Sequence, residues 1–413
     1  MARHPHKTAG RGLGHTGYVA RILALLLMGA CSRTTITVDA GEAPADAADA
    51  APQPRRLAFG IVDARLVDLE ATAAGGFVTL LDPRQPVGDP RRLAVQRFDA
   101  WAEPVGERLP LYETSLFTPN ADLTALPDGG FAAAHEEGRA PPVPTRVDFS
   151  VRLRRFDADG RVTSGSVHVY GDEWRPRLVT LRAGGYALST QVWAGEGGAG
   201  PLRLRVFDAG GGPRRERDLR AGCGAPFVSS AGFDLVCEDE EGALLARFDG
   251  QGQPLGTPVR LAMRAPAEPV DAIAPGPGGE RLVGSAGFAR RFDGAGEPLG
   301  AWQTFAWPGA EPWLTRLVEA GCREGPCGYW ALWLDEPESA TFRPRARRLD
   351  ALGVPEEDAE VLLAANADVL GPRAWYGDPH AAASAYGQSV LAWSATDLTP
   401  DLRVSVEGVL IVE

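Results

Sequence analysis

Two stretches of the chain, RFDGQGQPLG at Arg247–Gly256 and RFDGAGEPLG at Arg291–Gly300, are near copies of each other. In each, an aspartate followed by glycines can close a tight turn, because its carboxylate accepts backbone hydrogen bonds and glycine adopts positive φ. In the related stretch Leu202–Phe207, apolar and polar residues alternate before the aspartate, which is the period of a β-strand. Each copy therefore predicts a strand that leads into a turn.

The pattern returns along the whole chain from Arg55 onward. Its RFD-like triplet occurs at Arg97–Asp99, Arg155–Asp157, Val206–Asp208, Arg247–Asp249, Arg291–Asp293 and Arg348–Asp350, with a degenerate form at Arg403–Gly408. A glycine turn precedes each triplet, at Gly75–Phe77, Gly129–Phe131, Gly184–Tyr186, Ala231–Phe233, Gly278–Glu280, Cys327–Tyr329 and Tyr386–Gln388. Short apolar runs flank these turns, so each unit predicts two hairpins, or four strands.

Seven units of this kind, whose turns recur every 47 to 59 residues, favour an all-β fold. Four-stranded units bury their faces only against neighbouring units, so we predict a β-propeller of about seven four-stranded blades over residues 55–413. Six or eight blades remain open, because the terminal units are the least regular. Pairing of Leu57–Val62 with the strand around Val409–Val412 would close the ring. The repeats resemble those of secreted bacterial β-propeller proteins that carry R-F-D-x-x-G units, many of which are lipoproteins.

The N-terminal residues 1–30 have the form of a signal peptide, with a basic stretch followed by the short apolar run Ile22–Met28. The sequence Met28–Cys31 resembles the lipobox of bacterial lipoproteins, which implies that Cys31 is lipidated and becomes the mature N-terminus. The alternative is an ordinary signal peptide with an incidental cysteine. Residues 31–54, rich in Ala, Asp and Pro, then predict a disordered tether.

Charge and composition exclude several functions. Removal of residues 1–30 leaves 38 basic and 54 acidic residues, so we expect no nucleic-acid partner. Lys7 is the only lysine in the chain, which excludes Schiff-base chemistry and a P-loop in the mature protein. The sequence contains no G-x-S-x-G, H-E-x-x-H or dinucleotide-binding motif, and we expect no cofactor and no metal site.

Four cysteines follow Cys31, which favours disulfides in an exported domain. Cys223 and Cys237 flank one glycine turn symmetrically, and Cys322 and Cys327 enclose another. The two local pairs are therefore the predicted connectivity. A four-cysteine zinc site is the alternative, but neither pair has the C-x2-C spacing of zinc ribbons.

Five residues are candidates for binding. His135 and Glu136 stand at the end of a predicted strand and can act as a metal ligand or an acid–base pair, although exposed polar residues at such a place are normally only solvated. Trp193, Trp333 and Trp393 can line an aromatic funnel for sugars or peptides, but core packing between blades is the better explanation of these residues. Asp157–Gly160 faintly resembles a calcium loop, and a turn-forming aspartate is the simpler interpretation.

We therefore expect a monomeric binding or scaffold module, lipid-anchored in the bacterial cell envelope, at the outer membrane or cell surface. Its partner would be an envelope protein or a glycan, and its only contact with the membrane would be the lipid. The alternatives are a propeller-type lyase or glycoside hydrolase with an active site in the funnel, and a purely structural lipoprotein. No catalytic residue can be chosen from the sequence, which favours a function other than catalysis.

Overall fold

The computed structural model describes residues 55–83, 92–111, 120–139, 148–194, 199–229, 231–263, 270–306, 312–320, 328–335, 343–362, 375–376, 380–383, 388–396 and 404–412. The predicted signal peptide, Cys31 and tether lie outside these residues, as do Cys322 and Cys327. Nearly all of the described residues are in strands and turns, which confirms the all-β prediction. Within those residues, no helix has the length and apolar character needed to cross a membrane.

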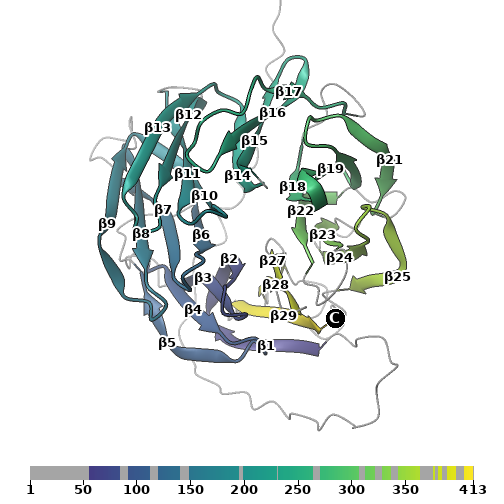
Figure 1. Ribbon diagram of the computed structural model, residues 1–413. Coiled ribbons are helices and arrows are strands. Elements are labelled where there is room, and N and C mark those ends of the chain that lie inside the picture. The colour runs from purple at the N-terminus through teal and green to yellow at the C-terminus, as the bar shows by residue number, and fades with distance from the viewer. Residues whose placement is uncertain are drawn as a thin grey trace, which may run out of the picture.

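Six four-stranded antiparallel sheets form the blades of a propeller (Figure 1). Blade 1 contains β2 (Ala64–Ala71), β3 (Phe77–Pro83), β4 (Ala94–Phe98) and β5 (Pro104–Pro110), and blade 2 contains β6 (Ala121–Ala125), β7 (Phe131–Arg139), β8 (Asp148–Phe156) and β9 (Val162–Gly171). Blade 3 contains β10 (Glu173–Thr180), β11 (Tyr186–Trp193), β12 (Ala199–Phe207) and β13 (Pro213–Leu219), and blade 4 contains β14 (Cys223–Val228), β15 (Gly232–Asp239), β16 (Gly242–Asp249) and β17 (Val259–Arg260). Blade 5 contains β18 (Ala272–Pro275), the 3₁₀ turn η2 (Pro277–Gly279), β19 (Arg281–Ser285), β20 (Phe288–Phe292) and β21 (Pro298–Thr304), and blade 6 contains β22 (Pro312–Glu319), β23 (Tyr329–Asp335), β24 (Arg343–Leu349) and β25 (Pro355–Leu362).

A further sheet joins the two ends of the described chain. Its strands are β1 (Arg55–Val62), β29 (Val404–Val412), β28 (Gln388–Thr396), β26 (Trp375–Tyr376) and β27 (His380–Ala383). β1 pairs antiparallel with β29, with Arg55 opposite Leu410, as predicted for ring closure. The prediction of four strands in every blade is wrong for this sheet, which has five because β26 and β27 pair with successive parts of β28.

The hydrophobic core lies between blades rather than inside one of them. Each cluster of buried apolar side chains is shared by two neighbouring sheets, from the closing sheet with blade 1 to blade 5 with blade 6. The aromatic residue after a glycine turn stacks on the phenylalanine of the RFD-like triplet of the same blade, as in Phe131 on Phe156 at 4.7 Å and Phe233 on Phe248 at 5.1 Å. In Figure 1 the sheets radiate around a common centre, with β2, β6, β10, β14, β18 and β22 innermost.

The glycine turns are required by close packing as well as by backbone conformation. Gly129 and Gly184 have φ near 85°, where other residues are strained. The next glycine lies against the backbone of its own blade, so a Cβ on Gly130 would collide with the Phe156 carbonyl oxygen and one on Gly185 with that of Phe207. The second glycine of the repeat therefore allows the aromatic pair behind it to stack.

The R-F-D-x-x-G motif closes a turn and joins neighbouring blades. The aspartate of the RFD-like triplet accepts two backbone hydrogen bonds in all six described copies, for example from Gln251 and Gln253 to Asp249 Oδ1 at 2.8 Å each. This bonding confirms the prediction of turn-forming aspartates, Asp157 included. The arginine can reach the next blade, as Arg247 does to the Gly294 carbonyl. The final glycine packs on the preceding blade, since a Cβ on Gly296 would be 2.7 Å from Val259 Cγ1.

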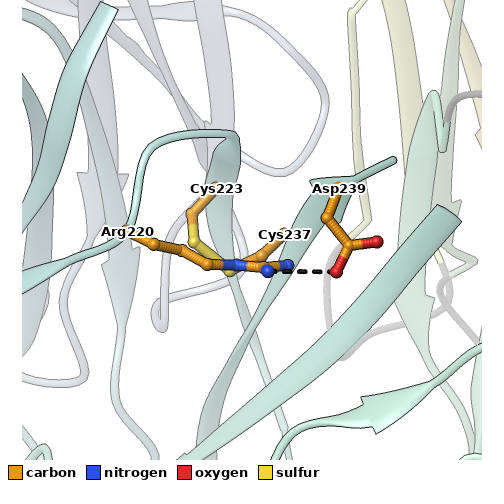
Figure 2. The surroundings of a disulfide bond; sticks show 4 residues. All are labelled: Arg220, Cys223, Cys237 and Asp239. Carbon is orange, nitrogen blue, oxygen red and sulfur yellow. Dashed lines mark hydrogen bonds and ion pairs between the residues drawn. A yellow bond between two sulfur atoms is a disulfide. The ribbon is translucent and has the colours of Figure 1, made fainter. Parts of the chain in front are cut away.

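The structure contains the predicted disulfide between Cys223 and Cys237 (Figure 2). The two residues are directly opposite each other on β14 and β15, with Cα atoms 3.7 Å apart. Beside it, Arg220 Nη1 donates to Asp239 Oδ2 at 3.1 Å. The bond therefore fixes the innermost strand of blade 4 to its neighbour.

Loss of this disulfide should weaken the fold. The double substitution Cys223→Ser and Cys237→Ser is expected to lower the free energy of unfolding by about 3 kcal/mol, because the bond joins residues 14 positions apart in the sequence. Denaturant unfolding of both proteins without reductant measures the difference. Peptide mapping without reductant should link these two cysteines, and a link from either one to Cys322 or Cys327 would contradict the assignment.

Candidate active or binding site in the central cavity

A cavity of about 1350 Å³ lies at the centre of the ring. Its walls come mainly from the innermost strands β2, β6, β10, β14, β18 and β22. Charged side chains on these walls include Asp68, Glu70, Asp122, Arg177, Arg316 and Glu319. Phe227 is the single aromatic residue among the described residues of the lining. The cavity therefore combines charged side chains with aliphatic ones and is not an aromatic funnel.

Four of these charged residues occupy the same position in different blades. In each blade, one residue after the innermost strand donates its N–H across the glycine turn. Counting back four residues from this donor gives Asp68, Asp122, Arg177 and Arg316 in blades 1, 2, 3 and 6. Ala225 and Ala272 occupy this position in blades 4 and 5. One layer of the cavity thus carries two acids, on the adjacent blades 1 and 2, and two arginines, on blades 3 and 6.

The two aspartates link the innermost strands of successive blades. Asp68 Oδ2 accepts the Leu123 N–H at 3.0 Å, and Asp122 Oδ2 accepts the Leu178 N–H in the same manner one blade further on. The guanidinium of Arg177 approaches Asp122 to 3.8 Å. Both aspartates therefore have a structural role in holding blades 1 to 3 together.

Burial and neighbouring charges raise the pKa of two acids in the cavity, Asp122 and Glu70. Burial, followed by the charge of Asp68, raises the pKa of Asp122 well above its usual range, against the opposing influence of Arg177. Burial, and then the charges of Asp68 and Asp122, likewise raise the pKa of Glu70, against the opposing influence of Arg316. The acidic side of the cavity therefore retains protons above the usual carboxylate range.

Glu70 should consequently destabilise the fold at high pH. A raised pKa in the folded state means that stability is lost as pH rises from the unfolded pKa through the folded one. The substitution Glu70→Gln is expected to raise the melting temperature by roughly 2–4 °C at pH 8, the shift that about 1 kcal/mol produces in a large domain. At pH 4 the melting temperatures of the variant and the unmodified protein should be equal. A lower melting temperature for the variant at pH 8 would show that the charge stabilises the fold.

Two of the predicted binding residues, Glu136 and Trp193, lie at one corner of blades 2 and 3. Glu136 Oε1 accepts hydrogen bonds from Asn120 Nδ2, at 2.8 Å, and from the backbone N–H of Arg175. The Arg175 guanidinium lies over the ring of Trp174, which is edge-on to Trp193 at 5.6 Å. Arg175 has φ of 50° at a bulge of β10, and its side chain lines the central cavity. The corner therefore connects to the cavity through Arg175.

His135 and Glu136 are themselves buried. Their exposed fractions are 1% and 0%. Burial lowers the pKa of His135 although Glu137, 3.7 Å away, opposes this, and burial raises the pKa of Glu136. Glu136 supports the wall at Arg175 through its bond to the Arg175 N–H, whereas His135 lies beside Glu137.

The remaining candidates fall elsewhere. Trp333 and Trp393 are buried, and Trp333 packs against Phe305 between blades 5 and 6, so core packing accounts for both and neither lines the cavity. Among the described residues, no group of three or more His, Cys, Asp or Glu side chains is placed to hold a metal ion.

The sequence analysis missed Asp68, Glu70 and Asp122. Alignment of the units on their glycine turns would have placed Asp68 and Asp122 at one position.

No protein-family model matches the sequence, and no curated protein matches it. Among solved structures, the chain is similar to a catalytically inactive variant of virginiamycin B lyase from Staphylococcus aureus with quinupristin, at 13% identity and a TM-score of 0.50 over 87% of this chain and 99% of that one. It is also similar to polysaccharide lyase Uly1, at 8% identity and a TM-score of 0.51 over 84% of this chain and 90% of that one. At these identities the likeness shows a β-propeller and nothing about chemistry.

Proposed function

We propose that the protein is a binding module, anchored in the bacterial cell envelope through Cys31, and that part of an envelope protein or glycan occupies its central cavity. The observation that carries this proposal is Glu70, a cavity-lining acid with no hydrogen bond or ion pair to any residue of the described chain. A charged group without a structural partner, held with a raised pKa in a cavity, is typical of a ligand site. The disulfide between Cys223 and Cys237 is consistent with an exported protein.

Capture of a partner from native envelopes tests this proposal. The purified protein and its Glu70→Gln and Arg175→Ala variants would be used as bait, in parallel with a glycan array. A partner that binds the unmodified protein and is lost from at least one variant would support a cavity site. Binding that both variants retain in full would place the partner on another surface and overturn the assignment to the cavity.

The lipid anchor makes a separate prediction. Cys31→Ala should release the protein from the membrane fraction or leave it unprocessed, because the thioether-linked lipid is its proposed attachment. Cell fractionation followed by mass measurement of the N-terminal peptide shows the outcome. Unchanged membrane fractionation of the variant would exclude Cys31 as the anchor.

A lyase or glycoside hydrolase is the second candidate, because the carboxyl groups of Asp68 and Asp122, from adjacent blades, both line the cavity. A carboxyl group whose pKa is raised beside a second carboxyl group can act as a general acid. Turnover of a captured glycan that Asp122→Asn abolishes would favour the enzyme. A bound glycan that is recovered unchanged would favour the binding module.

A further inference from the structure

The described RFD-like turns lie on one face of the propeller, the turn face, and the predicted tether joins the domain on that same face. In blade 1 the turn between the third and fourth strands lies at the end of the sheet where the second strand begins, since Phe98 is opposite both Phe77 and Pro104. In the closing sheet β28 and β1 both begin at one end, because each has its first residues opposite the last part of β29. Arg55, the residue after the tether, is therefore on the turn face.

Two turns of this face expose a large apolar side chain. The second residue after the aspartate donates its N–H to the aspartate Oδ1 in each of the six described copies, so it has an equivalent place in every blade. This residue is Trp101 in blade 1 and Leu352 in blade 6, with exposed fractions of 53% and 57%. In blades 2 to 5 it is Asp159, Gly210, Gln251 and Ala295.

The two apolar turns flank the point where the tether joins. The closing sheet lies between blades 1 and 6 (Figure 1), and its strand β27 contacts β2 on one side and β22 on the other. Equivalent positions of a propeller form a ring close to one plane. A flat surface placed near Arg55 can therefore touch Trp101 and Leu352 together.

A lipid bilayer is the surface that fits this arrangement. A flexible chain of the length of residues 31–54 averages roughly 25–30 Å from end to end, so the proposed lipid on Cys31 would keep the turn face near the membrane. Tethering gives the domain a high effective concentration at the bilayer, and weak contacts are then sufficient. Tryptophan is enriched at membrane–water interfaces, because its ring is apolar and its N–H can be hydrogen-bonded there.

We infer that the part of the turn face around Trp101 and Leu352 rests on the membrane that carries the lipid anchor, with both side chains at the level of the lipid headgroups. This inference rests on the proposed anchor at Cys31. It adds a contact of the domain itself to the lipid contact expected from the sequence. The opposite face, where the second and third strands of each blade turn, then points away from the bilayer.

Quenching of tryptophan fluorescence by brominated lipids tests the inference. The lipidated full-length protein is reconstituted into phosphatidylcholine vesicles, whose zwitterionic headgroups do not repel an acidic protein. Bromine near the headgroup end of the acyl chains quenches only the indole rings that touch the bilayer. We expect quenching in the unmodified protein, and an amplitude at least about threefold smaller in Trp101→Gln, because the exposed ring at the interface is lost.

Two controls carry a tryptophan elsewhere. Trp101→Gln combined with Gln251→Trp moves it to the equivalent turn of blade 4, across the ring from the closing sheet. Glu240→Trp adds one on the opposite face, in the exposed turn between β15 and β16. Neither added tryptophan should be quenched, and melting curves show that the variants are folded. Quenching at either place as strong as at Trp101 would overturn the orientation.

Flotation of the vesicles separates failure of the contact from failure of the anchor. A protein that floats with the vesicles through a modified Cys31, but shows no quenching that depends on Trp101, overturns the inference and leaves the anchor standing. A protein that stays in solution with Cys31 unmodified removes the anchor and this orientation together. A doubled mass in detergent that returns to one chain in Trp101→Gln would assign the turns to contact between two copies and overturn the membrane contact.

Discussion

Replacing Arg205 with methionine is expected to lower the free energy of unfolding by about 3–5 kcal/mol, because it leaves a buried carboxylate without its main counterion. Arg205 holds Glu173 through two bonds of 2.6 and 2.7 Å, and the two side chains are 5% and 1% exposed. The Arg205 guanidinium also lies 3.7 Å from the centre of the Tyr170 ring. Denaturant unfolding at pH 7 measures the loss.

Two further variants separate the ion pair from its surroundings. Arg203→Met also removes a contact with Glu173, at 3.0 Å, but Arg203 is bonded chiefly to the exposed Asp218 and should cost about 1 kcal/mol or less. The double variant Glu173→Gln and Arg205→Met should be more stable than Arg205→Met alone, since no buried charge is left unpaired. Equal losses for the two arginines would contradict this account.

The same ion pair should make stability depend on pH. Burial alone would raise the pKa of Glu173, but hydrogen bonds from Arg205 and Thr190 outweigh it, so the pKa is lowered. A group with a lowered pKa contributes stability above its unfolded pKa and loses it as pH falls through the folded one. The contribution should therefore be complete at pH 7 and decline below about pH 4. Glu173→Gln should remove that part of the acid-induced loss.

Gly185→Ala is expected to cost about 3–5 kcal/mol, because two penalties combine at this residue. Its φ of 86° is strained for alanine, and the added methyl group would collide with the Phe207 carbonyl oxygen. Gly256 provides a control for strain alone, since its φ is 88° and no heavy atom lies within 4 Å of a Cβ placed there. Gly256→Ala should therefore cost only about 1–2 kcal/mol.

Gly171 provides the control with neither penalty, because an added Cβ has open space and its backbone lies outside the left-handed region. Gly171→Ala should change the free energy of unfolding by less than about 0.5 kcal/mol. Thermal and denaturant unfolding of the three variants should give the order Gly185, Gly256, Gly171 in decreasing cost. A cost for Gly185→Ala no larger than that for Gly256→Ala would mean that the turn moves to accommodate the methyl group.

The propeller architecture could be predicted from the sequence, because each repeat is defined by interactions between residues that are close together in the chain. The aspartate of each RFD-like triplet bonds to the backbone two and four residues later, so the turn can be recognised without knowledge of the rest of the chain. The Cys223–Cys237 pair lies across one hairpin and could be predicted for the same reason. The five-stranded closing sheet could not, because its innermost position is divided between the short strands β26 and β27.

The cavity could not be predicted because its residues come from separate blades. Glu70 and Asp122 line the same cavity from the innermost strands of adjacent blades, and no spacing within one repeat indicates this. The tryptophans are prominent in the sequence, but burial of Trp333 shows that residue type does not distinguish a core position from a lining one. Glu136, which the sequence singled out at a strand end, does not line the cavity itself but accepts a hydrogen bond from the Arg175 N–H, and Arg175 lines it.

The pairing of β1 with β29 has a mechanical consequence for an anchored protein. β1 is the outer edge of its sheet, and Arg55, the residue that follows the predicted tether, is opposite Leu410. If the tether is held at the membrane while the propeller is pulled away, force reaches the ring at the Arg55 end of β1. Tension on the anchor would thus act first on the β1–β29 pairing that closes the ring.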